Sequence, residues 1–325
     1  VTLAAEVYLQ VIGYSNLEKS SAMNMFLLVP SILFFFIYRA LMRRSDKLTA
    51  GSRSTQGGLS LPLTRCGSVG WLALTGSGLF FVLTLLQYGC VLLSGFLKSK
   101  KGVYSFTLDH WNELWSIGAS PVVRSVVYAL IVAVVGTLFA ALFAYYMDRR
   151  RVPGRAFFDC IATMPYMLPG TCFGIGYILA FNHAPLKLTG TAIIVLANML
   201  FKQLPTSAKI CSATLAQLQP AQERSAQDLG AGRLAVIRDV VLPNMRPALL
   251  SCFVYNFTSS MTTAGAIIFL IDPSRQLAVF RLFDAVYRGD YALASVLASV
   301  ITAIVLAVEG LVWLLSRREG KRRVS

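Results

Sequence analysis

The sequence is poor in the residues from which catalytic and metal sites are built. Its 325 residues include only 15 Asp and Glu and two His, His110 and His183, which are too few and too isolated for a metal cage. Six Cys lie mostly within or beside apolar runs and show no CxxC spacing. This pattern indicates small buried hydrophobes rather than a metal site or a disulfide framework. We therefore expect no bound metal or cofactor.

Two sequence patterns of enzymes are missing as well. No phosphate-cradling GxxxxGKS/T loop occurs, and no nucleophile stands beside a base. The chain is therefore expected not to be an enzyme and not to hydrolyse ATP itself. Energy from ATP would have to come from another polypeptide.

Apolar residues dominate what is present. Hydrophobic residues make up 56% of the chain and charged residues only 14%, with a mean hydropathy of +0.63, which predicts an all-α, polytopic helical membrane protein. The net charge of +15 could suggest a nucleic-acid partner. The basic residues cluster beside apolar runs, however, and are not interleaved with aromatics on one face. We therefore expect contact with anionic membrane lipid and no nucleic acid.

Seven apolar segments near bilayer length predict seven transmembrane helices. They are residues 22–38 and, after a break, 69–97, 122–146, 157–181, 188–204, 248–271 and 291–315. Basic clusters at 149–155 and 317–323 place the ends that they follow in the cytoplasm. Alternation then makes the 205–247 loop cytoplasmic and places the loops 98–120, 182–187 and 272–290 outside. The amphipathic passage 277–287 is expected to lie along the outer surface.

The opening of the chain parallels its end. Both have a short amphipathic passage beginning Leu-Ala, a turn, one span and a basic tail. Because the chain begins with Val1 and not Met, we expect a fragment or a processed product. Residues 1–46 would be the tail of an upstream copy, 47–66 a Gly/Ser/Thr-rich cytoplasmic linker, and 67–325 a six-helix unit. The complete protein would then hold two copies in one polypeptide, although any two segments with one span and a basic tail look alike.

The longest charged, sparsely apolar passage between two spans runs from residue 223 to 243. Good helix formers precede Gly230, Gly230 and Gly232 permit a turn, and a second helix is expected from Arg233 until Pro243 stops it. The apolar residues of the second helix recur at three- and four-residue spacing, namely Leu234, Ile237 and Val241. This apolar stripe could pack on its own protein or bind a partner.

The spacing in this passage resembles the cytoplasmic EAA loop of binding-protein-dependent ABC importer permeases. That loop has an acidic-Ala-Ala start, three residues, Gly, nine residues, an aliphatic residue, one residue and Leu-Pro. The chain supplies Ser225-Ala226, Gly230, Val240 and Leu242-Pro243 at these positions. One departure is that Arg224 stands where the loop usually has Glu, with the acid displaced to Glu223.

The resemblance implies a type I ABC importer permease fold and a multi-pass location in the bacterial inner membrane. It also implies docking of this loop on an ABC ATPase subunit dimer, which would bind ATP and Mg²⁺, and delivery of substrate by an extracytoplasmic binding protein. The apolar stripe of Leu234, Ile237 and Val241 would supply the apolar contacts. The expected coupling residues are Glu223, Ala226, Asp228, Leu229, Gly230, Ala231, Leu234, Ile237, Val240, Leu242 and Pro243.

Two passages look most like the fused, two-half permeases of ferric-iron importers. They are residues 164–171 with Gly-Ile-Gly at 174–176, and residues 277–291, which end in Gly-Asp-Tyr. The resemblance suggests iron(III), or a chelate of it, as the substrate. Permeases for thiamine, polyamine, phosphonate and inorganic anions are similar and remain alternatives.

The 157–181 span is rich in helix-breaking residues, which lipid tolerates only where protein or a water-lined cavity covers the freed backbone groups. Its prolines and glycines predict either a flexing gate beside the substrate pathway or close helix packing. The expected pathway residues are Tyr166, Pro169, Gly170, Asn198, Ser259, Ser260, Thr262 and Thr263. Most of the polar side chains could instead make interhelical hydrogen bonds. Lys202 is a further polar residue that a route could use, although it lies near the predicted cytoplasmic end of its span and could simply snorkel.

Two other classes of membrane protein fit the sequence less well than an ABC permease. An ion-coupled secondary transporter needs carboxylates inside the membrane, and the only acid in a span core is Glu309, near a cytoplasmic end. A purely structural scaffold does not explain a Gly-hinged loop that ends in Leu-Pro. The ABC permease is therefore the preferred interpretation.

Overall fold

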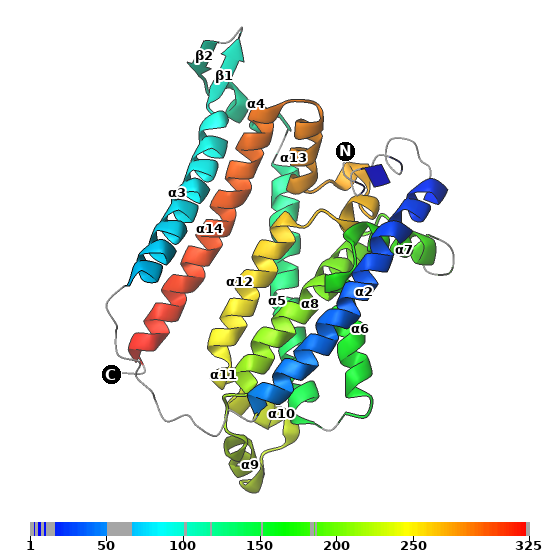
Figure 1. Cartoon of the computed structure of the whole chain (residues 1–325), viewed down its shortest axis with the longest axis vertical. Coiled ribbons are helices and arrows are strands. Elements are labelled where there is room, and N and C mark those ends of the chain that lie inside the picture. Colours follow the sequence, from blue (N-terminus) through cyan, green and yellow to red (C-terminus); the bar gives the residue numbers. More distant parts are fainter. Residues whose placement is uncertain are drawn as a thin grey trace.

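The computed structural model describes residues 3, 6–7, 10, 17–50, 67–100, 103–117, 119–150, 152–182, 185 and 187–322. The described chain is almost wholly helical, as predicted, and its long helices form an elongated bundle (Figure 1). One antiparallel hairpin, β1 Leu97–Lys100 with β2 Val103–Phe106, stands at one end of the bundle. Short α4, Asp109–Ile117, follows it. The sequence-based interpretation did not include this hairpin.

The centre of the bundle consists of α5 Ser120–Arg149, α8 Ala192–Leu215 and α12 Arg246–Thr262, which pack against one another. Small residues on α5 let the three helices approach closely, since a Cβ added at Gly136 would lie 3.2 Å from the Asn256 amide nitrogen of α12. Buried hydrogen bonds tie the same helices together. Ser207 Oγ donates to Asn256 Oδ1 at 2.7 Å, and Asn256 Nδ2 donates to Thr137 Oγ1 at 3.2 Å.

Four described helices are long and apolar enough to cross a membrane: α2 Leu17–Ala50, α3 Ser68–Ser94, α5 and α14 Tyr291–Arg322. A fifth results if α6 Arg155–Met167 and α7 Gly170–Phe181, which meet at 111°, count as one broken span. Seven spans were predicted. The two others, α8 and α12, lie in the same bundle, but α8 is long enough without being apolar enough, and α12 has only 17 residues. In particular, α12 ends at Thr262, short of the predicted residue 271, and the chain continues through a break into the 3-10 turn η2, Ala266–Phe269.

Helix α8 differs from its prediction in the opposite sense. The expected span ended at residue 204, but the helix continues through Pro205 to Leu215. Ser207, Cys211 and Leu215 are buried in this extension. Residues 205–215 of the predicted loop are therefore a helix within the bundle, and the exposed part of the loop begins after them.

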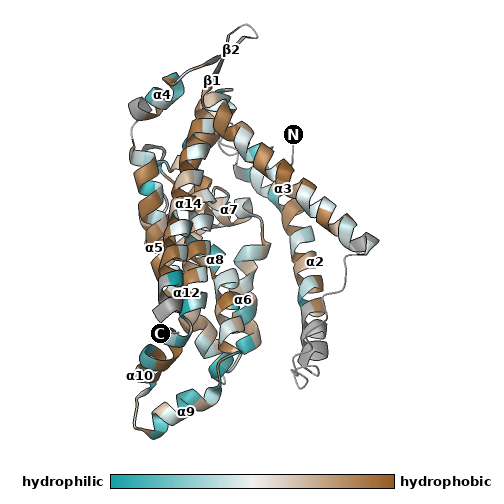
Figure 2. Cartoon of the chain, turned by 90° about the vertical axis from the view of Figure 1, so that its left-hand side faces the viewer, coloured by the Kyte–Doolittle hydropathy of each residue, from teal (hydrophilic) through white to brown (hydrophobic). Residues whose placement is uncertain are grey.

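The two ends of the bundle agree with the predicted sidedness. Figure 1 places α9, Pro220–Asp228, at the same end as the C-terminal part of α14, whereas the hairpin, α4 and α13, Ala278–Tyr287, lie at the other end. Helix α9 is largely hydrophilic, while the long helices are largely hydrophobic (Figure 2). Helix α13 is amphipathic, as expected: Val279 and Phe280 are buried, whereas Tyr287 is exposed.

The outer helices make few contacts. Helix α3 packs along α14, and none of the residues in its most apolar stretch is buried (Figure 1). Helix α2 lies against α6 and α7, where Thr171 Oγ1 donates to Asn24 Oδ1 at 2.7 Å and Arg39 Nη2 donates to the Ala156 carbonyl at 2.6 Å. Helix α2 also includes residues 47–50 of the predicted linker. The rest of that linker, and most of the opening passage compared with residues 277–291, lie outside the described residues.

Candidate functional site

Helix α9 ends in a turn that requires a glycine. Gly230 has φ +89°, and its N–H donates to the Gln227 carbonyl at 2.9 Å, while the Ala231 N–H donates to the Ala226 carbonyl at 3.0 Å. This pair of bonds is a Schellman motif, in which the left-handed residue after the helix is normally Gly. The predicted turn at Gly230 is therefore confirmed. Gly232 has φ −68° and ψ 160°, which any residue can adopt.

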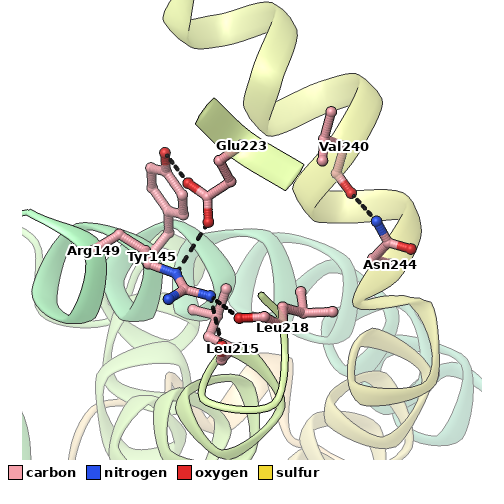
Figure 3. A network of polar contacts seen from close by, with 7 residues as sticks. All are labelled: Tyr145, Arg149, Leu215, Leu218, Glu223, Val240 and Asn244. Atoms are coloured by element: carbon pink, nitrogen blue, oxygen red, sulfur yellow. Dashed lines mark hydrogen bonds and ion pairs between the residues drawn. The ribbon is translucent and has the colours of Figure 1, made fainter. Parts of the chain in front are cut away.

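The second helix of the loop does not stop at Pro243. α10 Arg233–Ala235, the π-helical η1 Val236–Val241 and α11 Leu242–Asn244 follow one another without a break. The Leu242 N–H donates to the Ile237 carbonyl, five residues back, which widens the turn ahead of the proline. The Asn244 Nδ2 donates to the Val240 carbonyl at 2.8 Å (Figure 3). The helix therefore passes through Pro243, and the expectation of a stop there was wrong.

Two of the three residues predicted to touch a partner face the protein's own core. Ile237 is 6% exposed and Val241 2% exposed, and both lie in a buried cluster with Ala144 of α5 and Cys211 of α8. The apolar stripe thus packs mainly on the bundle, because Ile237 and Val241 contact the ends of α5 and α8 that are predicted to be cytoplasmic. Direct contact between a partner and Ile237 or Val241 is incompatible with this packing.

The displaced acid of the loop makes an internal ion pair. Glu223 Oε1 lies 3.0 Å from Arg149 Nε at the end of α5, and the Tyr145 hydroxyl donates to Glu223 Oε2 at 3.1 Å (Figure 3). Arg149 Nη2 also donates to the carbonyls of Leu215 and Leu218, each at 2.7 Å. Both charged side chains are largely buried. Glu223 therefore holds α9 on α5, while Arg224, at the usual position of Glu in the family loop, is exposed.

Two large apolar side chains remain at the free end of this loop. Leu229 is 90% exposed and Leu234 80% exposed, on either side of the Gly230 turn. Asp228 and Gly230 are exposed beside them. The remaining predicted coupling residues are partly buried against the cluster that contains Ile237, namely Ala226, Ala231, Val240, Leu242 and, within the helix, Pro243. The surface available to a partner is thus the turn and its two leucines.

The second predicted region surrounds the bend between α6 and α7. A Cβ added at Gly170 would lie 3.0 Å from the Ala266 backbone nitrogen, and one at Gly174 would lie 2.4 Å from Phe269 Cδ2. The backbone is interrupted after Met167 and again after Thr262. The two interruptions lie in contact because glycines of α7 leave room for the backbone and side chains of η2. Gly170 and Gly174 are closely packed, as one of the two alternatives predicted, whereas no atom outside the helix's own backbone lies within 4 Å of a Cβ added at Gly176.

The predicted pathway residues separate into two groups. Gly170 and Asn198 line one narrow gap with Pro165, Lys202 and Ala266. The hydroxyl groups of α12 have other uses: Ser260 pairs with the Gln203 amide at 2.9 Å, and the hydroxyls of Thr262 and Thr263 donate to the Ser259 carbonyl. Tyr166 is exposed, and Pro169 is the N-cap residue of α7.

The sequence offered Lys202 as a polar residue that a route could use, but placed it near a cytoplasmic end, where it could instead snorkel. The structure places it in the middle of α8, with Nζ 3.7 Å from a Cβ added at Gly265. The only sequence signal for it is that a Lys interrupts an apolar span at all. Glu309, the single acid noted in a span core, accepts a hydrogen bond from Thr258 Oγ1 at 3.3 Å.

Comparison with protein families matches residues 133–321 to the model of the binding-protein-dependent transport system inner membrane component. The chain belongs to this family. The matched range includes the α9–α11 loop, both backbone interruptions and α14, so the expected ABC importer permease fold and inner-membrane location are confirmed. As a member of the family, the permease is a membrane component and not an enzyme.

The names of curated relatives of the permease refer to different substrates. It is 28% identical over 94% of its length to the ferric transport system permease protein FbpB of Actinobacillus pleuropneumoniae, and it covers 45% of that protein. It is 30% identical to the sulfate transport system permease protein CysT of Salmonella typhimurium, over 74% of its own length and 93% of that protein. A putative 2-aminoethylphosphonate permease, PhnV of Salmonella paratyphi A, is 25% identical over 76% of the chain and 94% of its own length. The chain thus spans about half the length of the ferric permeases that it matches.

A solved structure gives the same fold. The bacterial alginate ABC transporter in complex with an alginate-bound periplasmic protein matches 76% of the chain and 93% of its own chain, with a TM-score of 0.60 at 17% identity. At this identity the similarity shows the fold alone.

Proposed function

We propose that the chain is part of the permease of an ATP-driven importer, in which the turn at Gly230 couples the membrane helices to an ATPase subunit dimer. A binding protein outside the membrane would deliver the cargo to the opposite end, near α13. The single observation that carries the proposal is the pair of exposed leucines, Leu229 and Leu234, held around a left-handed glycine on the predicted cytoplasmic end. Exposed apolar residues on a fixed turn are suited to insertion into a groove of a partner.

The internal contacts of the loop support a coupling role. Glu223, Arg149 and the buried Ile237 fix α9 and η1 on α5 and α8, so the loop is anchored on the bundle along one side only. A partner that moves the free side therefore moves the helices to which the other side is attached. ATP and Mg²⁺ would be bound by the partner and not by this chain.

The proposed cargo is iron(III) or one of its chelates. Support comes from the ferric permeases, whose similarity extends over 94% of the chain. A second candidate is an oxyanion, because the sulfate permease is 30% identical and is matched over 93% of its length. The central gap beside Lys202 also bears on this choice.

The coupling proposal is tested by Leu234→Asp in the complete protein, co-expressed with its ATPase. We expect loss of ATPase co-purification and of stimulated ATP hydrolysis with no change in melting temperature, since Leu234 is exposed and packs on no core residue. The matched control is Leu108→Asp between β2 and α4, where the leucine is also exposed but lies outside the membrane helices, at the opposite end of the bundle from the loop. Normal stimulation of ATP hydrolysis by the Leu234→Asp protein would contradict the proposal.

A further inference from the structure

The gap beside the two backbone interruptions is lined mostly by apolar and aromatic residues, with two side-chain nitrogen donors and no acid. Asn198 and Lys202 of α8 face it together with Pro165, Gly170 and Ala266. Asn198 is only 4% exposed, and its Nδ2 has no hydrogen-bond partner among the described residues. A buried amide donor without a partner is costly, which indicates that a group absent from the chain itself is bound there at some stage.

Lys202 adds a positive charge to the same gap. Within the described part of the chain it makes no ion pair or hydrogen bond. Thirteen residues separate it from Leu215 at the end of α8, which is about 20 Å at 1.5 Å per residue. A four-carbon stem cannot cover that distance, so Lys202 does not snorkel to the cytoplasmic surface. Its Nζ lies instead beside Gly265, where α12 is interrupted.

The third contribution comes from the backbone. Gly170 is the first residue of the 12-residue α7 and lies on the gap. The amino end of a helix carries a partial positive charge and unpaired N–H groups, which favour anions. All three features therefore present positive or partially positive charge to the gap, namely the Asn198 amide N–H group, the Lys202 ammonium and the amino end of α7.

We propose that this gap, formed by Asn198, Lys202 and the first turn of α7, binds anionic oxygen groups of the cargo as it passes the two interruptions. The proposal rests on the import function proposed above and narrows its substrate class. A free Fe³⁺ ion would be repelled by Lys202, whereas a free oxyanion, or an iron(III) chelate with a net negative charge, would be attracted. In the described arrangement the gap has a volume of about 10 Å³, close to the smallest space that admits one water molecule. Binding therefore requires α7 and η2 to move apart.

The test uses Phe201→Cys, which places a thiol on the rim of the gap, in a complete protein that otherwise lacks cysteine and is reconstituted with its ATPase. A negatively charged sulfonate thiol reagent and a positively charged trimethylammonium reagent of similar size are compared with ATP present. We expect the sulfonate reagent to react about tenfold faster at low salt, since a unit charge about 6 Å away changes each rate about threefold, in opposite directions, in a water-like dielectric. High salt should reduce the preference.

Variants of the lysine decide the result. Lys202→Met should abolish the preference, Lys202→Glu should reverse it, and Lys202→Arg should keep it and thereby show that the substituted helix still folds. The matched control is Lys209→Met on the same helix, whose exposed Lys contacts the Tyr38 ring and not the gap. Equal rates with Lys202 in place, or a preference that survives Lys202→Met, would overturn the inference.

Two further readouts separate the possible failures. A rate that does not change with ATP counts against the import function, whereas an ATP effect without charge preference counts only against the anion site. Uptake of sulfate and of iron(III) citrate into vesicles then separates the two sources of the anion. The probe that the unsubstituted protein takes up identifies the source, and undiminished uptake of that probe in Lys202→Glu overturns the proposal.

Discussion

At Gly230 the backbone takes φ +89°, whereas at Gly232, two residues later, it takes φ −68°. A β-branched side chain is strained at the first position and fits at the second. An added Cβ meets no other residue within 4 Å at either glycine. The two residues therefore differ in conformation alone, which makes them a matched pair for testing the turn.

We expect Gly230→Val to uncouple ATP hydrolysis from transport and Gly232→Val to leave both unchanged. The left-handed conformation costs a residue such as Val about 1–3 kcal/mol, which would shift Leu229 and Leu234 relative to each other without affecting the buried cluster. The measurement is transport per ATP hydrolysed by the complete transporter. Equal coupling ratios in the two variants would show that the shape of the turn is not used.

Glu223 provides a second prediction for a single residue. We expect Glu223→Gln to weaken the docking of α9 on α5 by about 1–3 kcal/mol, because a largely buried, charge-assisted contact with Arg149 and Tyr145 is lost. Amide hydrogen exchange across 220–228 should accelerate accordingly. Asp239→Asn, which removes the exposed pair with Arg238, should leave exchange in α9 unchanged.

These residues also show what could be predicted from the sequence. The Gly230 turn was predictable because a Schellman motif depends on a few neighbouring residues. The burial of Ile237 was not, because its periodicity is the same whether the stripe meets Cys211 of α8 or a partner. The position of Lys202 within its helix was missed for a related reason: the predicted span ended at residue 204, whereas the buried contacts of α8 continue the helix past Pro205.

At the scale of elements, the segment α10–η1–α11 has an exposed start and a buried middle. Leu234 lies on the free side, while Val236, Ile237 and Val241 fill the space between the ends of α5 and α8. One helix therefore carries both a candidate contact for a partner and a structural anchor.

Shortening the anchor should affect stability. We expect Ile237→Ala to lower the free energy of unfolding of the cytoplasmic end by about 2–4 kcal/mol, since a buried isoleucine leaves a cavity. Leu234→Ala should have almost no effect on stability but should weaken ATPase binding. Thermal unfolding in detergent, measured beside ATPase co-purification, distinguishes the two outcomes. A stable Ile237→Ala protein that fails to bind the ATPase would instead show direct contact at Ile237.

The contact between α7 and η2 depends on glycine in a similar way. We expect Gly174→Ala to destabilise the protein by about 1–3 kcal/mol, because its Cβ would lie 2.4 Å from Phe269 Cδ2. Gly176→Ala, two residues along the same helix and free of such contacts, should be neutral or slightly stabilising. The comparison is made by thermal unfolding, and equal melting temperatures would show that η2 adjusts freely.

At the scale of the whole molecule, the polar residues lie among α5, α8 and α12, while α3 remains apolar and exposed. This arrangement favours a pathway beside the inner helices and not along α3. In a cysteine-free protein, a Cys at position 166 or 198 should change its reactivity when ATP is added, and one at Phe80 of α3 should not. ATP-dependent labelling restricted to position 80 would place the pathway elsewhere.

The passage of the helix through Pro243 also has a mechanical consequence. From Arg233 to Thr262 the chain is helical except at Met245, so a single non-helical residue separates the helical segment that carries Leu234 from α12, which ends beside the Gly265 interruption. The α12 part alone is 17 residues, or about 26 Å. Met245, at the junction of the two segments, is fully buried. We expect a small tilt imposed at Leu234 to displace the far end of α12, where η2 packs against α7. Movement of the loop would then reach the contact between α7 and η2 through one continuous stretch of chain.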